Sequence, residues 1–470
     1  MYENIFSQNF ALNFFYGFFF LISNIFFSIC IGQNKVIKKI FFFKEFQSIV
    51  IFFLVFCLYT FILNVIVISD YKNLSSIIFL IFFLQIFYLL KNLKNFKLKF
   101  DLDLKVEEKF IFLIFFSLYL ISILPLSDAD SISIYQYIPS TIYSEGLKEI
   151  DLVKNLEFTL LSNTEILLLF SAIFKSDNLG AQLNLLTLFF FIIIKFKDHK
   201  NFSLIIFSSP LIIYFISAQK LQLFFGLIFL LLFILINRDI FKKKVELFIL
   251  ILLLAFYSSG KFSYILFTIP LYIYFFYRNL NHWKHVVLYS FLSFIIVYVP
   301  LLSIKQIYFH NIFAPFFDNF LGQGFEAYNA FAFSIRSSEG WISDPKNIFL
   351  YVRPFVSLEI GRLSSSLGLI FLLMFFNPKL QKKTNYFPFL IVILVILTGQ
   401  ILPRYYFEAF LLLAFFYKPK NYFIKLVIYS HVLIIFLISV IYIFISYIQL
   451  GVLKNKTDYM NRFSYSFFNS

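Results

Sequence analysis

Two carboxylates lie close together where an apolar run of the chain ends. The run FIFLIFFSLYLISI is followed directly by LPLSDADSISIYQY, which puts Asp128 and Asp130 beside the membrane if the run is a span. A single carboxylate is enough to cap a helix after Pro125, so capping explains one aspartate and leaves the other unexplained. A carboxylate can also take the proton of an attacking hydroxyl or amine as a general base. Asp128 and Asp130 are therefore our candidate catalytic residues.

Further ionisable residues lie at the ends of other apolar runs. A charge at the centre of a bilayer costs on the order of 2.5–3.5 kcal/mol, and less near the surface, so these positions need an explanation. Arginine binds phosphate oxygens through a planar fork and lysine binds them as a point charge, which suits a phosphate-bearing substrate. The candidate substrate-binding residues are Glu165, Lys220, Lys261, Arg353, Arg404 and Glu408, and Arg362 is a further charged residue of this group.

Most of these residues also have a simpler interpretation. Lys220 and Lys261 lie in the short turns SAQKLQ and SSGKFS, from which a lysine can reach lipid headgroups. Arg404 and Glu408 are four residues apart, which is the spacing of a local ion pair on one helix face. Arg353 suits an anchor at the membrane surface. The sequence leaves both interpretations open.

The composition indicates a polytopic, all-α membrane protein. Of the 470 residues, 61% are hydrophobic and 14% are charged, and the mean hydropathy is +0.85, far from the balance of a soluble domain. The net charge of +15 comes mostly from lysines in short loops. It therefore reports on topology, and we expect no nucleic-acid partner. The many phenylalanines reflect a low-GC genome and do not by themselves predict an aromatic binding surface.

Apolar runs predict a helical bundle of about 14 spans, because a crossing helix needs about 20 apolar residues. The first run has no basic segment before it and no small-residue cleavage site after it, so we expect it to stay in the membrane. The predicted spans are 9–32, 47–68, 75–90, 110–125, 179–194, 202–217, 221–236, 245–258, 262–276, 286–303, 361–376, 386–399, 405–417 and 426–449.

Charge predicts which side each loop faces. Lys-rich loops are expected on the cytoplasmic side, and they lie at 33–45, 91–109, 195–200, 237–244, 277–285, 377–385 and 418–425. The alternation holds if 163–174, whose apolar part is too short to cross, is a helix at the outer interface. Two long loops, 126–178 and 304–360, then face outward and carry short interfacial helices. All the candidate residues lie at or near outer ends of spans.

The sequence shows no cofactor motif. Cys30 and Cys57 both lie inside predicted spans, which leaves no disulfide framework and no cysteine metal site. His310 has no second histidine or cysteine at ligand spacing, so it predicts no metal site. The sequence therefore identifies no cofactor, and it leaves open whether the protein uses a divalent metal ion.

The order of these features resembles the GT-C glycosyltransferases, the superfamily of protein O-mannosyltransferases and lipid A aminoarabinose transferases. The segment LPLSDADSISIYQYIPSTIYSEG is similar to the first outer loop of those enzymes. NTEILLLFSAIF with KSDNLGAQLNLLTLFF resembles their short helix, turn and next span. TGQILPRYYFEAFLLL and YFHNIFAPFF are similar to their Arg-Tyr span start and their Pro-containing outer loop. The resemblance covers roughly residues 110–420, with three spans before it and Asp-Ala-Asp in place of adjacent carboxylates.

The resemblance implies a division of the chain and a chemistry. Residues 1–109 would be accessory spans with a basic loop, 110–425 a GT-C-like core, and 426–470 a final span and tail. The core would move a sugar, with inversion, from a polyprenyl-phosphate donor to an envelope glycan, lipid or protein acceptor. An Asp128 or Asp130 carboxylate would be the general base at the outer face of a bacterial inner membrane. Membrane lipids and the lipid-linked donor are the expected partners.

Two other classes fit part of the pattern. An O-antigen polymerase or ligase also has many spans and a sizeable outer loop, and in that case Arg336 and Arg353 would matter more than Asp128 and Asp130. A lipid-linked saccharide transporter should show an internal repeat and charges near the membrane midplane. The sequence shows neither of those two features.

Overall fold

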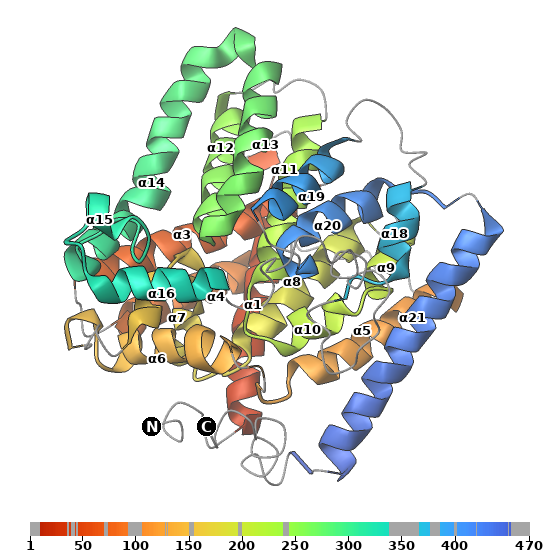
Figure 1. The fold of residues 1–470 in the computed structure, drawn as a ribbon. Coiled ribbons are helices and arrows are strands. Elements are labelled where there is room, and N and C mark those ends of the chain that lie inside the picture. The colour runs from red at the N-terminus through yellow and green to blue at the C-terminus, as the bar shows by residue number, and fades with distance from the viewer. Residues whose placement is uncertain are drawn as a thin grey trace. The chain divides into compact units, whose positions relative to one another are not determined.

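The computed structural model contains only helices and irregular segments in the part of the chain that it describes (Figure 1). The described residues are 10–34, 37–38, 43, 46–69, 74–92, 106–126, 128, 130–149, 155–195, 200–237, 244–337, 366–376, 386–398, 402–419, 421–449 and 451–452. The predicted all-α fold class is confirmed for these residues. Several of the predicted Lys-rich loops lie wholly or partly outside them.

Five helical segments in the described ranges are long and apolar enough to cross a membrane. They are Phe15–Gln33, Gln47–Ile68, Ser75–Asn92, Leu280–Phe309 and Tyr422–Gln449. A sixth span results if Leu211–Ser217 and Gln222–Asn237 count together, although the two helices are bent by 119°. The structure thus supports a helical membrane protein.

The structure corrects the predicted span 202–217. Two helices occupy this region, α9 (Lys200–Phe207) and α10 (Leu211–Ser217), with Ser208, Ser209 and Pro210 between them. Proline has no amide hydrogen to donate and disfavours helical geometry in the residue before it. The apolar run is therefore uninterrupted in sequence but broken in structure.

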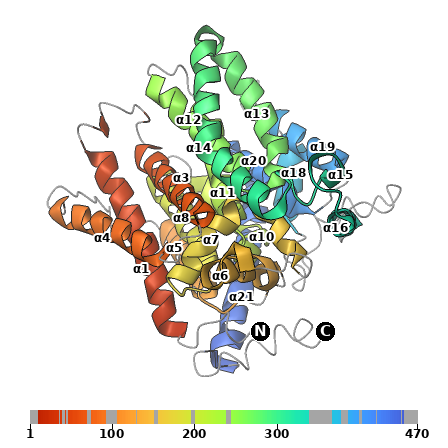
Figure 2. The ribbon, with the colours of Figure 1, turned by 90° about the vertical axis from the view of Figure 1, so that its left-hand side faces the viewer.

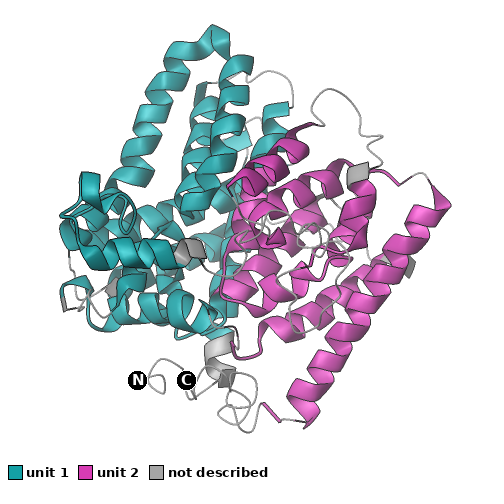
Figure 3. Ribbon diagram, in the orientation of Figure 1, with its two compact units in different colours: residues 1–99, 130–179, 231–336 teal, residues 100–129, 180–230, 337–470 magenta. Residues whose placement is uncertain are grey.

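The chain forms two compact units, each drawn from three separate stretches of sequence (Figure 3). Unit 1 contains residues 1–99, 130–179 and 231–336, and unit 2 contains residues 100–129, 180–230 and 337–470. Both units therefore include parts of the predicted core segment 110–425, and the helix α11 (Gln222–Asn237) supplies residues to each unit.

Unit 1 packs its helices around a core rich in phenylalanine. The Phe20 ring lies 4.7 Å from that of Phe170 and 4.5 Å from that of Phe174. In Figures 1 and 2, α12, α13 and α14 lie side by side. The main helices are α1 (Phe10–Gln33), α3 (Gln47–Ile68), α4 (Leu74–Asn92), α6 (Tyr137–Ser144), α7 (Asn163–Ile173), α12 (Lys244–Ser259), α13 (Ile265–Arg278), α14 (Trp283–Phe309), α15 (Asp318–Leu321) and α16 (Glu326–Ser337).

The ends of α3 and α12 meet at the start of α7, and the end of α14 joins the end of α3. Asn163 accepts a hydrogen bond from Asn64 of α3 (2.8 Å) and donates one to Ser259 of α12 (2.7 Å). Tyr308, near the end of α14, donates to the Val67 carbonyl of α3 (3.4 Å). The charge pattern predicts that the C-terminal ends of α3, α12 and α14 share the outer side, and the structure does bring these three ends together.

Unit 2 is built from shorter helices. Phe407 packs edge-on against Phe215, with ring centroids 4.7 Å apart, and joins α20 to α10. The helices are α5 (Val106–Ser122), α8 (Leu179–Lys195), α9, α10, the first part of α11, α18 (Leu369–Phe376), α19 (Phe387–Leu397), the 3₁₀ helix η11 (Pro403–Tyr406), α20 (Phe407–Phe416), α21 (Tyr422–Ile443) and the π-helix η12 (Phe444–Gln449).

Two helical glycines allow close approach of neighbouring segments, as small residues commonly do in membrane helices. A Cβ on Gly17 of α1 would lie 2.2 Å from Ser176 Oγ and 2.8 Å from Ser176 Cβ. A Cβ on Gly226 of α11 would lie 2.9 Å from the end of the flexible Leu411 side chain and in ordinary contact, at 3.8 Å, with the Phe407 ring. The first contact cannot be relieved by rotating a side chain, whereas the second can.

These contacts predict different results for the same substitution at two sites. Alanine favours a helix over glycine by about 1 kcal/mol at both positions, so the difference between the variants isolates the steric clash. We expect Gly17→Ala to lower the free energy of unfolding by about 1–3 kcal/mol and Gly226→Ala to leave it unchanged or raised. Thermal unfolding of the full-length protein in detergent micelles measures both. Equal midpoints for the two variants would contradict this description of the packing.

Candidate functional site

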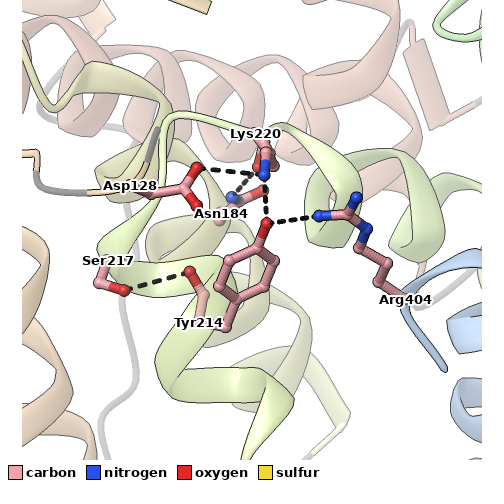
Figure 4. Close-up of polar contacts among 6 residues, drawn as sticks. All are labelled: Asp128, Asn184, Tyr214, Ser217, Lys220 and Arg404. Carbon is pink, nitrogen blue, oxygen red and sulfur yellow. Dashed lines mark hydrogen bonds and ion pairs between the residues drawn. The ribbon is translucent and has the colours of Figure 1, made fainter. Parts of the chain in front are cut away.

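Three of the predicted charged residues come together in unit 2 around one tyrosine (Figure 4). Lys220 Nζ lies 3.1 Å from Asp128 Oδ2. The Tyr214 hydroxyl oxygen accepts hydrogen bonds from Lys220 Nζ and from Arg404 Nη1, the latter at 3.0 Å. We call these four residues the Tyr214 cluster. The structure thus joins one predicted catalytic residue to two predicted substrate-binding residues.

Lys220 lies in the turn of a helical hairpin formed by α10 and α11, whose axes are bent by 119°. Asn184 of α8 holds this turn. Its amide nitrogen donates to the carbonyl oxygens of Phe215 (2.8 Å) and Lys220 (2.6 Å), and its amide oxygen accepts from Phe224 N (2.9 Å). One buried side chain therefore satisfies backbone groups on both arms of the hairpin and fixes the backbone of Lys220.

Arg404 is positioned by main-chain contacts of its own. It lies in η11, whose first residue is Pro403, directly before α20. The Gln222 side chain donates to the Arg404 carbonyl oxygen, and the rings of Phe215 and Phe407 pack together beside it. The arginine is thereby linked to the same hairpin that carries Lys220.

Asp128 is the most exposed member of the ion pair. Its side chain is 27% exposed, against 7% for Lys220. It follows α5, which packs against α10. A partly exposed ion pair adds little to stability, so the contact matters chiefly for placing a carboxylate beside Lys220. The interpretation of Lys220 as a lysine that extends to the lipid headgroups is wrong, because the side chain is buried and bound to Asp128 and Tyr214.

Asp130 lies in unit 1, directly before the π-helix η4 (Ser131–Gln136). It occupies the N-cap position of that helix in helical geometry, and its side chain makes no capping hydrogen bond. The capping interpretation is therefore not seen at Asp130. The sequence left open which aspartate acts as the base. Asp128 belongs to the Tyr214 cluster through its ion pair with Lys220.

Glu165 completes a capping box at the start of α7. Its carboxylate accepts from Ser162 N (2.7 Å) and Ser162 Oγ, and the Ser162 side chain in turn accepts from Thr164 N. Burial raises the pKa of the Glu165 carboxyl, while the hydrogen bonds from Ser162 and the charge of Lys261 oppose this rise. The position of Glu165 is accounted for by helix initiation, and Lys261 lies in the same part of unit 1.

The remaining predicted residues divide by whether they are described. Glu408 is fully buried in the first turn of α20. Arg353 and Arg362 lie outside the described residues, as does the side chain of Arg336.

Sequence reasoning missed Tyr214, Asn184 and Lys305. Tyr214 and Asn184 lie within apolar runs, LIIYFIS and LGAQLNLLTLFF, where a tyrosine or asparagine is easily attributed to packing. Lys305 of α14 donates to the carbonyl oxygens of Thr159 (2.8 Å) and Ala314 (3.0 Å). It thereby links the two long loops 126–178 and 304–360, which were predicted to face the same side. Polar residues near the ends of apolar runs were the available signal.

The described residues include no group of three or more His, Cys, Asp or Glu side chains able to hold a metal ion. Cys30 and Cys57 are free and buried. His310 follows the last residue of α14.

The chain matches no protein-family model, no curated protein and no solved structure at a significant level. The site is therefore interpreted from its own geometry.

The Asn184 contacts predict a specific loss of stability. Asn184→Leu keeps the branched shape of the side chain and leaves three buried backbone groups without their partner, each of which costs about 1–3 kcal/mol. We expect the free energy of unfolding to fall by at least about 2 kcal/mol. Thr187→Val, three residues further along α8, is the control, because Thr187 bonds only within its own helix, to Leu183 O. Detergent-solubilised variants unfolded by heat provide the comparison, and equal stability of the two would contradict the role given to Asn184.

Proposed function

We propose that this chain is a membrane glycosyltransferase that moves a sugar from a polyprenyl-phosphate-type lipid to an envelope glycan, lipid or protein acceptor. One observation carries the proposal: a partly exposed carboxylate, Asp128, lies 3.1 Å from a buried lysine that also contacts Tyr214, which is bound by Arg404. A base beside one cation, with a second cation bound to the same tyrosine, suits a reaction that removes a proton at one atom and releases a phosphate at another.

In the proposed reaction an acceptor hydroxyl attacks the anomeric carbon of the bound sugar. The new carbon–oxygen bond forms as the bond from that carbon to the phosphate oxygen breaks, with inversion at the carbon. The hydroxyl proton passes to Asp128. The electron pair of the broken bond stays on the phosphate oxygen, whose charge Lys220 and Arg404 stabilise.

The position of the site along the chain agrees with the proposed location. Asp128, Lys220 and Arg404 all lie where the charge pattern predicts outer ends of spans, within a bundle of about 14 crossings. That side would be the outer, periplasmic face of a bacterial inner membrane. The resemblance of residues 110–420 to GT-C enzymes supports the same arrangement, with the first three spans as an added module.

The base assignment is tested by two conservative variants. Asp128→Asn removes the proton acceptor while keeping the side-chain size, and loss of a general base typically lowers a rate by about 10²–10⁴-fold. We expect the envelope glycan made by the protein to disappear with Asp128→Asn and to persist with Asp130→Asn. Mass spectrometry of envelope glycans compares cells that carry each variant, the wild type or no protein.

Full glycan production by both aspartate variants would refute the assignment of Asp128 as the base. Loss on replacing Arg336 or Arg353, with both aspartate variants active, would instead favour a polymerase or ligase. Correct folding of each variant is checked by its thermal midpoint in detergent.

The sidedness is tested by cysteine labelling. Ser144→Cys lies in the first outer loop at an exposed position, and Lys382→Cys lies in a predicted cytoplasmic loop. An impermeant thiol reagent added outside should label only the first variant, since the native Cys30 and Cys57 are buried. Labelling of Lys382→Cys alone would place the proposed site on the wrong side of the membrane.

A further inference from the structure

We propose that Tyr214 forms a phosphoryl-binding site together with Lys220 and Arg404, in which the Tyr214 hydroxyl donates a hydrogen bond to a phosphoryl oxygen. The inference deepens the proposed function and rests on it for the lipid-borne nature of the phosphate. It assigns a ligand-binding role to a residue that sequence reasoning did not identify.

Both groups that hydrogen-bond to the Tyr214 hydroxyl oxygen are cations. The Tyr214 oxygen accepts from Lys220 Nζ and from Arg404 Nη1. Neither cation can accept a hydrogen bond, because ammonium and guanidinium groups are donors only. The single hydroxyl proton of Tyr214 is therefore directed to some other acceptor, and the hydrogen bonds of the described residues include none for it.

The Tyr214 side chain is buried. Tyr214 is 8% exposed, its ring packs against Phe215 with centroids 5.6 Å apart, and Lys220 Nζ lies 4.8 Å from the ring centroid. The phenol is thus held in place by packing and by two charged donors. A buried donor that lacks an acceptor is unfavourable, so a ligand oxygen placed there would stabilise the site.

The donors of the Tyr214 cluster suit a phosphoryl group. A group that meets one hydroxyl donor beside a lysine and an arginine must be anionic and must offer several acceptor oxygens. A phosphoryl group offers them in a tetrahedral arrangement. A guanidinium carries five N–H donors and can bind Tyr214 and a phosphoryl oxygen at the same time.

Figure 4 shows Lys220 between the Asp128 carboxylate and the Tyr214 hydroxyl. Lys220 bonds to Asp128 on one side and to Tyr214 on the other, and Tyr214 in turn receives Arg404. A phosphoryl group at Tyr214 and Arg404 is thereby separated from the carboxylate by the lysine. Inverting transfer requires the attacking group and the leaving phosphate on opposite faces of the sugar carbon, and this order provides a base on one side and an anion site on the other.

The test is a binding measurement on the full-length protein in detergent, with farnesyl phosphate, farnesol and inorganic phosphate as separate probes. Tyr214→Phe removes the hydroxyl and keeps the ring. Tyr272→Phe is the matched control, because the Tyr272 hydroxyl is also hydrogen-bonded, to Ser290 Oγ at 2.8 Å, and lies in unit 1. Since a hydrogen bond to a charged group is comparatively strong, we expect Tyr214→Phe to weaken farnesyl phosphate binding about tenfold or more and Tyr272→Phe to leave it unchanged.

The three probes separate the sources of the phosphate. Tight binding of farnesyl phosphate alone supports a lipid phosphate, and Tyr214-dependent binding of inorganic phosphate as well supports a site for the phosphoryl group itself. Equal farnesyl phosphate affinity of wild type and Tyr214→Phe overturns the inference. So does farnesol binding as tightly as farnesyl phosphate, or no binding of either phosphate probe by the wild type.

A second variant keeps the inference testable if Tyr214→Phe does not fold. Arg404→Lys keeps the charge and loses the planar fork, so it should also weaken farnesyl phosphate binding, and unchanged affinity overturns the inference. The binding measurement needs no sugar transfer. Tyr214-dependent binding combined with unchanged glycans in Asp128→Asn cells would refute the proposed transfer alone, whereas loss of glycans with no effect of Tyr214→Phe on binding would refute the phosphoryl site alone.

Discussion

The Tyr214 cluster depends on the hydrogen bonds that the Asn184 side chain makes with the α10–α11 hairpin. The chain must turn sharply between two apolar helices, and the turn leaves backbone groups without helical partners. In an apolar environment such groups need partners from within the protein. The Asn184 amide bonds to Phe215 O, Lys220 O and Phe224 N, which closes the turn and fixes Lys220. Lys220 in turn contacts Asp128 and Tyr214, and Arg404 contacts the same tyrosine.

Unit 1 solves the same problem with different residues. The Gly260 carbonyl oxygen, just after α12, accepts from the hydroxyl of Thr164 and lies 2.7 Å from Ser162 Oγ. Lys305 bonds to two carbonyl oxygens, one in each of the long loops 126–178 and 304–360. In both units, short polar side chains pair with the backbone where apolar helices end, and in unit 1 a lysine does so as well. This explains why charged or polar residues near span ends fall into two groups: Glu165 and Lys305 organise the backbone, whereas Lys220 and Arg404 bind other side chains.

The sequence predicts the class of fold and three of the four residues of the Tyr214 cluster, for a physical reason. Asp128, Lys220 and Arg404 stand out because charges are costly in apolar surroundings, and the structure brings these three together. Tyr214 and Asn184 do not stand out, because a tyrosine or an asparagine inside an apolar run is compatible with ordinary packing. The break at Pro210 was missed because apolar periodicity continues across it, and the structural role of Glu165 depends on Ser162, which periodicity does not single out.

A structure of the full-length protein in lipid nanodiscs with farnesyl phosphate would show directly where the phosphate binds. We expect density for the phosphate within hydrogen-bonding distance of Tyr214, Lys220 and Arg404, with the Asp128 carboxylate on the far side of Lys220. A phosphate bound away from all three residues, or a Tyr214 hydroxyl that donates to a protein group with the phosphate present, would contradict this expectation.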